Sequence, residues 1–448
     1  MRSAGGSAQG REVLRLAVPA FLALVAEPLF LLADSAIIGH LGTAQLAGLG
    51  VASATLITAA NIFVFLAYGT TSIVARQVGA GSERGALAAG VDGTWLAVGL
   101  GAATAVAVGL GAEPLCRLFG ASEAALSYAA TYLRISALGI PAMLVALAAT
   151  GVLRGLQDTR TPLAASVLGF TSNIVLNLVL VYGLGWGIAG SAWGTVLAQT
   201  GMAAGLVTVL VRHARRAGAT LHPHPGRVLR AAVSGIPLLV RTLALRAVLL
   251  LTTWVAAGLG DVPLAAYQVS ATVWSFLAFA LDALAIAAQA LTGRALGAGD
   301  VEGARSATAL MVRWGLWGGA ALGVVVLAVH RVLPALFTQD PAVRSALAAA
   351  LVVVALGQPL SGYVFVVDGV LIGAGDGRWL ARAMAATFVL YAPLAIAVHV
   401  SADRLLVHGA SWAVAVLWCA FTVFMAIRGL FFHRRVRGDG WAVTGAAR

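Results

Sequence analysis

Residues 76–81 are Arg-Gln-Val-Gly-Ala-Gly, and residues 294–299 are Arg-Ala-Leu-Gly-Ala-Gly. The shift that carries position 76 onto position 294, here called the repeat offset, superimposes other segments of the chain as well. Because one offset holds across separated segments, the sequence predicts an internal duplication into two halves. The further matches are Leu41-Gly42 on Leu259-Gly260, Leu115, Leu118 and Phe119 on Leu333, Leu336 and Phe337, Gly151-Val152-Leu153 on Gly369-Val370-Leu371, and Asp158 and Arg160 on Asp376 and Arg378.

The composition places both halves in a membrane. Of the 448 residues, 60% are hydrophobic and 10% are charged, and the mean hydropathy is +0.93. Soluble domains are about 25% charged, and a soluble chain this apolar would not keep its surface hydrated. A soluble enzyme, a disordered protein and a nucleic-acid-binding module are therefore excluded, in spite of a net charge of +12.

Twelve segments are long and apolar enough to cross a bilayer, which takes about 20 residues of helix. The first segment is too long for a signal peptide and contains Glu27 and Asp34, so we expect it to be retained. The predicted spans are 13–38, 46–75, 91–112, 127–153, 162–183, 188–211, 229–258, 264–293, 307–330, 345–373, 379–400 and 405–430.

The spans divide equally between the two halves. An even number of helices in each half makes both halves run through the membrane in the same direction, a plan found in transporters. We predict an all-α integral membrane protein with twelve transmembrane helices in two pseudo-symmetric six-helix lobes. The predicted N-terminal lobe is 1–211, a cytoplasmic linker is 212–228, and the C-terminal lobe with its basic cytoplasmic tail is 229–448. A central cavity and rocking of the lobes would give alternating access.

Arginine placement predicts the orientation. All 29 basic residues are arginines, and cytoplasmic loops carry an excess of positive charge. With the N-terminus inside, most arginines, Arg428 among them, fall on the cytoplasmic side. We therefore predict a multi-pass protein of the plasma (cytoplasmic) membrane, the inner membrane of the cell, with both termini cytoplasmic. On the outer side lie Arg117, Arg134, Arg331, Arg344 and Arg404.

Two carboxylates lie inside the first span. Glu27 and Asp34 are two helical turns apart and so occupy nearly one face, and Pro19 and Pro28 should bend or loosen the same helix. A carboxyl group in a poorly hydrated site is able to bind and release a proton near neutral pH. The alternative for Asp34 is a hydrated, inactive residue near the span end. For Glu27 the alternatives are a structural pair with an arginine and a role in transport.

Amides and hydroxyls at helical spacing accompany these acids. Asn173 and Asn177 are one turn apart in the fifth span, and Thr195 and Gln199 are one turn apart in the sixth. Such side chains often serve only to hold membrane helices together. The functional interpretation makes them partners of Asp34 within the same lobe.

The second half has its own charges at membrane depth, Arg241, Arg246, Asp282 and Asp368. Ionisable groups in hydrocarbon are costly and mark functional or tightly paired sites. One interpretation is a buried ion network that fixes the shape of the lobe, and the other is a second proton relay. We favour the network.

No motif indicates catalysis, a metal or a cofactor. The absence of lysine removes the Walker A phosphate loop. Cys116 and Cys419 are too few for a disulfide framework. Gly185, Gly187 and Gly190 form a GxGxxG with no strand before it, which indicates a turn between helices. We expect no enzyme activity, no metal, no cofactor other than a proton or sodium gradient, and no nucleic-acid partner.

Four stretches resemble one family of transporters. They are similar to segments of the MATE (multidrug and toxin extrusion) family, in particular its DinF-like branch, and the resemblance extends from about residue 14 to about residue 432. The stretches are Leu32–Gly42 at the end of helix one, Gly151–Arg160 after helix four, Ala280–Ala283 with Gly293–Ala298 in helix eight, and Val367–Gly373 in helix ten.

The resemblance implies a cation-coupled exporter. By similarity, Asp34 is the coupling carboxylate of the first lobe, Asn173 and Thr195 are its polar partners, and Pro19 is the proline at which helix one bends. Asn177 stands where some relatives have an acidic residue, and their aromatic hydroxyl is replaced by Phe30.

Without that second charge, the resemblance favours proton over sodium coupling and gives Asp34 more weight. The predicted function is antiport by alternating access, with export of amphipathic, often cationic, organic compounds by a monomer in the lipid bilayer. The auxiliary candidates are Glu27, Gln199, Arg241, Asp282 and Asp368. The alternative is a lipid-linked precursor flippase of a related superfamily, for which Arg241 and Arg246 would bind the head group.

Overall fold

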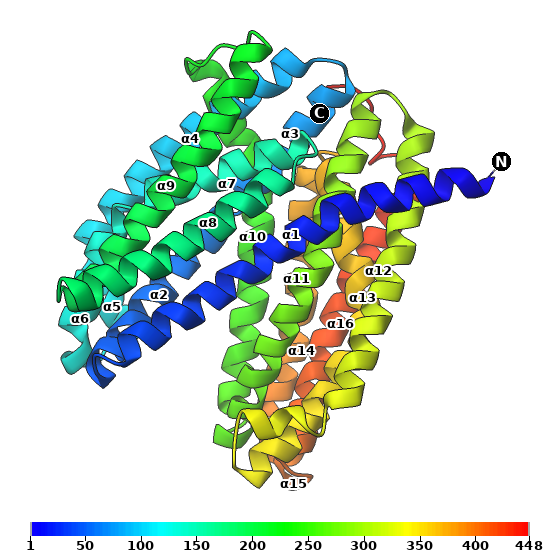
Figure 1. Ribbon diagram of the computed structural model, residues 1–448. Helices are drawn as coiled ribbons and strands as arrows, with labels where there is room; N and C mark the ends of the chain where they lie inside the picture. The colour runs from blue at the N-terminus through cyan, green and yellow to red at the C-terminus, as the bar shows by residue number, and fades with distance from the viewer. Residues whose placement is uncertain (1, 447–448) are drawn as a thin grey trace. The chain divides into compact units, whose positions relative to one another are not determined.

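The computed structural model describes residues 2–446, and all secondary structure among them is helical (Figure 1). In the first helix the side chains of residues 2–9, 27 and 30–32 lie outside the description, and Glu27 is among them. The helices are α1 (Arg2–Gly39), α2 (Thr43–Phe63), α3 (Phe65–Gly79), α4 (Glu83–Leu110), α5 (Ala112–Leu118), α6 (Glu123–Ala137), α7 (Ile140–Gly155), α8 (Arg160–Asn177), a π-helical turn (Leu178–Gly183), α9 (Gly187–Arg216), α10 (Pro225–Gly258), α11 (Asp261–Gly297), α12 (Val301–Val329), a 3₁₀ turn (Leu333–Leu336), α13 (Pro341–Gly373), α14 (Gly377–Val400), α15 (Ala402–Val407) and α16 (Ala410–Arg437).

The described helices include ten apolar spans, or eleven when α6 and α7 are counted as one span bent by 51°. These correspond to the predicted spans from the second onward, and α1 contains the first. Two predicted spans contain breaks. The second is interrupted at Val64 between α2 and α3, and the fourth bends between α6 and α7, where Gly139 precedes a helix with proline in its first turn.

The chain forms two compact units. Leu14–Ile236 make the first, here called the first lobe. Pro237–Thr444, together with the beginning of α1 up to Val13, make the second lobe. In the first lobe α7 packs against α3, α4 and α9, and in the second lobe α13 packs against α11, α12 and α16.

The internal duplication is visible in the turns. Gly81 and Gly299 are related by the repeat offset, and their φ angles are +75° and +80°. Gln157, the one non-glycine residue with positive φ in the described chain, corresponds to Gly375, whose φ is +70°. A residue in this left-handed conformation ends a helix, and glycine adopts the conformation without steric cost. Equivalent helices therefore end in the same way in both lobes.

Close helix packing is duplicated too. A methyl group added to Gly151 of α7 would lie 2.9 Å from Cα of Ala67 in α3. One added to Gly369 of α13 would lie 2.8 Å from Cα of Ala285 in α11, and the repeat offset relates this pair to the first. Small residues allow membrane helices to approach at backbone distance. The two lobes thus share one helical frame.

The connection between α9 and α10, residues 217–224, is fastened to the first lobe. Asp92 of α4 is buried and accepts hydrogen bonds from the backbone N–H of His224 (3.2 Å) and from Nε of Arg227 (2.6 Å). Nε1 of Trp95, nearly one turn along α4, donates to the carbonyl of Leu221 (3.1 Å). The connection therefore belongs structurally to the first lobe.

The segment after α16 folds back onto the second lobe. Arg435 donates from Nε to Asp376 (2.6 Å) and from a terminal nitrogen to the carbonyl of Gly440 (2.9 Å). Trp441 is fully buried, and its Nε1 donates to the carbonyl of Val436 (3.0 Å). This segment is thus part of the packed structure.

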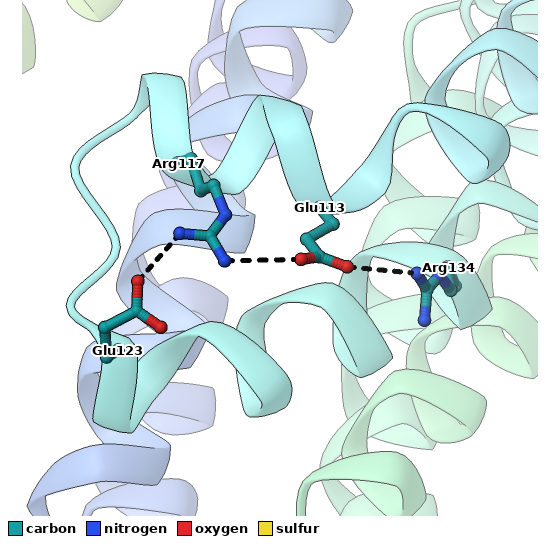
Figure 2. A network of polar contacts seen from close by, with 4 residues as sticks. All are labelled: Glu113, Arg117, Glu123 and Arg134. Atoms are coloured by element: carbon teal, nitrogen blue, oxygen red, sulfur yellow. Dashed lines mark hydrogen bonds and ion pairs between the residues drawn. The ribbon is translucent and has the colours of Figure 1, made fainter.

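A chain of exposed ion pairs joins α5 and α6 (Figure 2). Arg117 lies 2.7 Å from Glu123 and 3.4 Å from Glu113, and Arg134 lies 3.9 Å from the other oxygen of Glu113. The hydrogen bond and charge of Glu123 raise the pKa of Arg117. Ion pairs this exposed contribute little to stability, and we do not count this network as a candidate site.

Candidate functional site

Asp34 is the centre of a buried polar site in the first lobe. Its carboxylate, on α1, is 2% exposed. Oδ1 accepts hydrogen bonds from Nδ2 of Asn177 on α8 (2.6 Å) and from the hydroxyl of Ser191 on α9 (2.7 Å). Oδ2 accepts one from the hydroxyl of Tyr132 on α6 (3.3 Å). A single carboxylate thus connects four helices, and the alternative of a hydrated, inactive Asp34 does not fit this burial.

The network continues along α8 and α9. Nδ2 of Asn177 also donates to Oδ1 of Asn173 (2.9 Å), and Nδ2 of Asn173 donates to Oγ1 of Thr195 (3.0 Å). The structure therefore joins Asp34 to three of the four polar partners expected from the sequence, Asn177, Asn173 and Thr195. Their role in coupling stays a prediction.

Two members of the site, Ser191 and Tyr132, are absent from the sequence prediction. Ser191 lies four residues before Thr195 and so shares its helix face, which is a signal that sequence analysis could have used. Tyr132 offers none, because a tyrosine in an apolar span is equally typical of a membrane interface. Only the packing of α6 against α9 distinguishes the two cases.

The hydrogen-bond polarity of the site fits an ionised carboxylate. All three groups that contact Asp34 donate to it, and none accepts from it. Oδ1 of Asn177 is buried and has no hydrogen-bond partner among the described residues. Gly194 of α9 lies against this oxygen, where a side chain would overlap it.

A π-helical turn, Leu178–Gly183, follows Asn177 directly. Within it the hydroxyl of Tyr182 donates to the carbonyl of Ile37 in the last turn of α1 (2.5 Å). The sequence predicts an ordinary helix through residue 183, so this winding is a feature that sequence analysis missed. It gives the α8 segment a second contact with α1, beyond Asp34.

The remaining first-lobe candidates lie differently. Gln199 makes no hydrogen bond to the Asp34 network in the described part of the chain, and its side-chain oxygen lies beside Gly139. The helix α1 continues through Pro19 and Pro28, so a bend at Pro19 stays a prediction. Glu27 lies outside the described residues.

The second lobe contains a buried ion cluster. Asp368 of α13 accepts from Nε of Arg241 on α10 (3.0 Å), pairs with a terminal nitrogen of the same guanidinium, and lies 2.9 Å from a terminal nitrogen of Arg428 on α16. All three side chains are at least 90% buried. Asp282 and Arg246, also predicted at membrane depth, are half-buried on α11 and α10.

Arg428 is the third member of this cluster. Counted by sequence as cytoplasmic, it is 2% exposed and lies over the rings of Phe432 and Phe365, at 5.1 and 6.0 Å from their centroids. A long arginine near a span end can reach inward as well as outward. Here the carboxylate of Asp368 and the two rings stabilise the inward position.

The duplication does not extend to the polar sites. By the repeat offset, Asp34 and Asn173 correspond to Thr252 and Tyr391. The hydroxyls of Thr252 and Tyr391 are hydrogen-bonded at 2.7 Å in the interior of the second lobe. A neutral pair thus occupies the position that a carboxylate and an amide occupy in the first lobe. No cluster of three metal-ligating side chains occurs among the described residues.

Comparison with known families identifies the family to which the chain belongs. The MatE family model matches the chain twice, over residues 19–179 and 237–397. The chain belongs to the MATE family. The second match begins at position 237, which is where the repeat offset places position 19, the start of the first match. This confirms the resemblance seen in the sequence, and members of the family are transporters.

Relatives span nearly the whole MATE chain. It is 32% identical over 433 residues to Protein DETOXIFICATION 44, chloroplastic, of Arabidopsis thaliana, and the match covers 94% of this chain and 80% of that protein. It is 29% identical over 447 residues to DNA damage-inducible protein F of Escherichia coli K12, and this match covers 96% and 94% of the two chains. The DinF-like relationship is therefore confirmed.

Solved structures share the fold. A Vibrio cholerae MATE transporter in its bent form superimposes with a TM-score of 0.87 at 20% identity, covering 98% of this chain and all of that one. A MOP superfamily transporter of Pyrococcus furiosus superimposes with a TM-score of 0.83 at 21% identity, covering 96% of each chain. These likenesses confirm the predicted twelve-helix, two-lobed MATE fold.

Proposed function

We propose that this MATE protein is a proton-coupled antiporter that exports amphipathic, often cationic, organic compounds, with Asp34 as the coupling carboxylate. The observation that carries the proposal is a single carboxylate, 2% exposed, whose three hydrogen-bond partners are neutral side chains from α6, α8 and α9. An uncompensated buried carboxylate is costly to ionise, so its protonation is easily coupled to a change in packing.

The two protonation states require different partners. Ionised Asp34 accepts from Asn177, Ser191 and Tyr132, which holds α1 against three helices. Protonated Asp34 becomes a donor and needs an acceptor. Oδ1 of Asn177 has no hydrogen-bond partner among the described residues, which supports rotation of that amide. Charge-assisted hydrogen bonds are lost at the same time, so α1 is free to repack. Such a two-state element couples proton binding to substrate release.

The donor set favours a proton over sodium. A hard cation binds through several oxygen ligands. Beside Asp34 the Asn177 side chain presents Nδ2, which already donates to two oxygens. A proton needs only one carboxylate oxygen. The proposal places the protein in the plasma membrane, as a monomer with both termini in the cytoplasm, driven by the proton gradient without a bound cofactor.

The flippase alternative depends on exposed arginines. Arg241 is buried against Asp368, so it is not oriented to bind an anionic head group. Arg241, one of the two arginines on which the flippase alternative depends, is thus already paired within the second lobe.

The test is ethidium efflux from proteoliposomes that contain the purified protein. A proton gradient and a sodium gradient are imposed separately on wild type, Asp34→Asn and Asp92→Asn. Asp92 is the matched control, because it is a buried carboxylate of the same lobe outside the network. We expect proton-driven efflux in wild type and Asp92→Asn, and none in Asp34→Asn. Efflux retained by Asp34→Asn, or driven by sodium alone, would contradict the proposal. Binding of a polyprenyl-linked sugar without dye efflux would support the flippase.

A further inference from the structure

The π turn departs from the winding of every other apolar span described. The N–H of Leu184 donates to the carbonyl of Val179, five residues earlier, at 2.9 Å, whereas α-helical hydrogen bonds join residues four apart. Gly190 of α9 lies against this turn, because a Cβ added to Gly190 would stand 2.8 Å from the carbonyl oxygen of Leu180. Such turns are rare in proteins, and those that occur are often found at functional sites.

The π turn places two side chains on one side of the α8 segment. Asn177 and Tyr182 are five residues apart, and in an α-helix of 3.6 residues per turn they would point about 140° away from each other. Here both reach α1, Asn177 at Asp34 (2.6 Å) and Tyr182 at the carbonyl of Ile37 (2.5 Å). Because Asp34 and Ile37 are three residues apart, these contacts lie within one turn of α1.

The Ile37 carbonyl needs an external donor. The last carbonyls of a helix lack intrahelical partners, and the N–H of Leu41, the α-helical partner of Ile37, donates instead to Ile38 (2.9 Å). The Tyr182 hydroxyl therefore caps the Ile37 carbonyl at the C-terminal end of α1.

The two contacts respond differently to a proton. The Asn177 contact depends on the charge of Asp34. Asp34 also contacts Tyr132 from α6 and Ser191 from α9, and Tyr132 is the ionisable group among these three partners. The Tyr182 contact joins a neutral hydroxyl to a neutral carbonyl, so protonation of Asp34 leaves it intact.

We propose that Tyr182 is a positioning residue that keeps the C-terminal end of α1 attached to the α8 segment while Asp34 changes protonation state. The end of α1 at Ile37 is then the fixed point, and the part of α1 before Asp34 is the part that moves. This inference rests on the proposed proton coupling at Asp34.

Hydrogen–deuterium exchange of the purified full-length protein tests the fixed point. Exchange is compared at pH 5.5 and 8, after correction for the intrinsic pH dependence, in wild type, Tyr182→Phe and Tyr128→Phe. Tyr128 is the matched control, because its hydroxyl makes no hydrogen bond in the described part of the chain. In wild type we expect acidification to increase exchange before Asp34 and to leave residues 38–41 unchanged. In Tyr182→Phe, residues 38–41 and 178–184 should exchange about fivefold faster, with a new pH dependence at 38–41.

Deletion of Val179 is an independent variant. Removing one residue returns the π turn to α-helical winding and leaves Asn177 and the tyrosine four residues apart, about 40° around the helix. The hydroxyl then stays on the side of α1, so exchange at 38–41 should remain slow, unlike in Tyr182→Phe. If this deletion fails to fold, Tyr182→Phe still decides.

Exchange at 38–41 that is unchanged in Tyr182→Phe, or that rises on acidification in wild type, would overturn the inference. So would Tyr182→Phe with altered exchange but wild-type proton-driven efflux. Absence of efflux in wild type would count against the proposed function, while faster exchange at 38–41 in Tyr182→Phe would still report the tether itself.

Discussion

Gly194 faces the side-chain oxygen of Asn177 so closely that any side chain at position 194 would overlap it. Gly194→Ala should therefore displace Asn177 from Asp34. We expect a destabilisation of about 1–3 kcal/mol from overpacking and a loss of proton-driven efflux. Thermal unfolding and dye efflux measure the two effects.

The control for this substitution is Gly201→Ala on the same helix. Gly201 has open space around its Cα, so alanine there should be neutral or stabilise by up to about 1 kcal/mol. Equal effects at both positions would mean that helix propensity, and not the fit around Asn177, decides.

The ion cluster of the second lobe should be a structural element. Arg241→Gln leaves Asp368 with one guanidinium in a buried site, and breaking a buried pair costs about 3–5 kcal/mol. Arg305→Gln removes an exposed partner of Asp439 and should cost less than about 1 kcal/mol. Thermal unfolding distinguishes the two. A stable Arg241→Gln protein with altered pH dependence of efflux would instead indicate a second proton relay.

Asp92 should protect the connection 217–224 and the first turn of α10 from proteolysis. Asp92→Asn weakens charge-assisted bonds to Arg227 and His224, so trypsin should cut after Arg227 about tenfold faster than in wild type. Asp403→Asn, at an exposed position of α15, should leave the cleavage rate unchanged. The rate is measured by mass spectrometry of the fragments, and equal rates in wild type and Asp92→Asn would refute the anchoring.

Trp441 should stabilise the second lobe. Because it is fully buried after α16, Trp441→Ala should cost about 3–5 kcal/mol. Trp412→Ala at an exposed position is the comparison and should cost much less. Unfolding temperatures of the two variants provide the check. A small effect at Trp441 would show that the segment after α16 is only loosely attached.

The sequence contains the centre of the candidate site because polar side chains are rare in apolar spans. Asp34, Asn173, Asn177 and Thr195 stand out at helical spacing, and the structure joins them. The sequence also predicts the duplicated helical frame, because the close helix contacts are made by small residues at positions related by the repeat offset.

Other features depend on tertiary packing that no local pattern encodes. The π turn forms where Gly190 of another helix approaches its backbone. The direction of Arg428 is set by Asp368, which lies on a different helix, and by the rings around it. A span-end arginine has the same local sequence whether it turns toward water or toward a buried carboxylate.

The hydrogen-bonded pair Thr252–Tyr391 has a consequence for energetics. The position in the second lobe that the repeat offset relates to Asp34 is uncharged. Duplication of the helical frame therefore does not supply a second carboxylate there to bind a proton. With Asp34 alone loading one proton for each monovalent cation exported, a cycle moves no net charge across the bilayer. Transport of such a compound should then follow the pH difference and be insensitive to the membrane voltage.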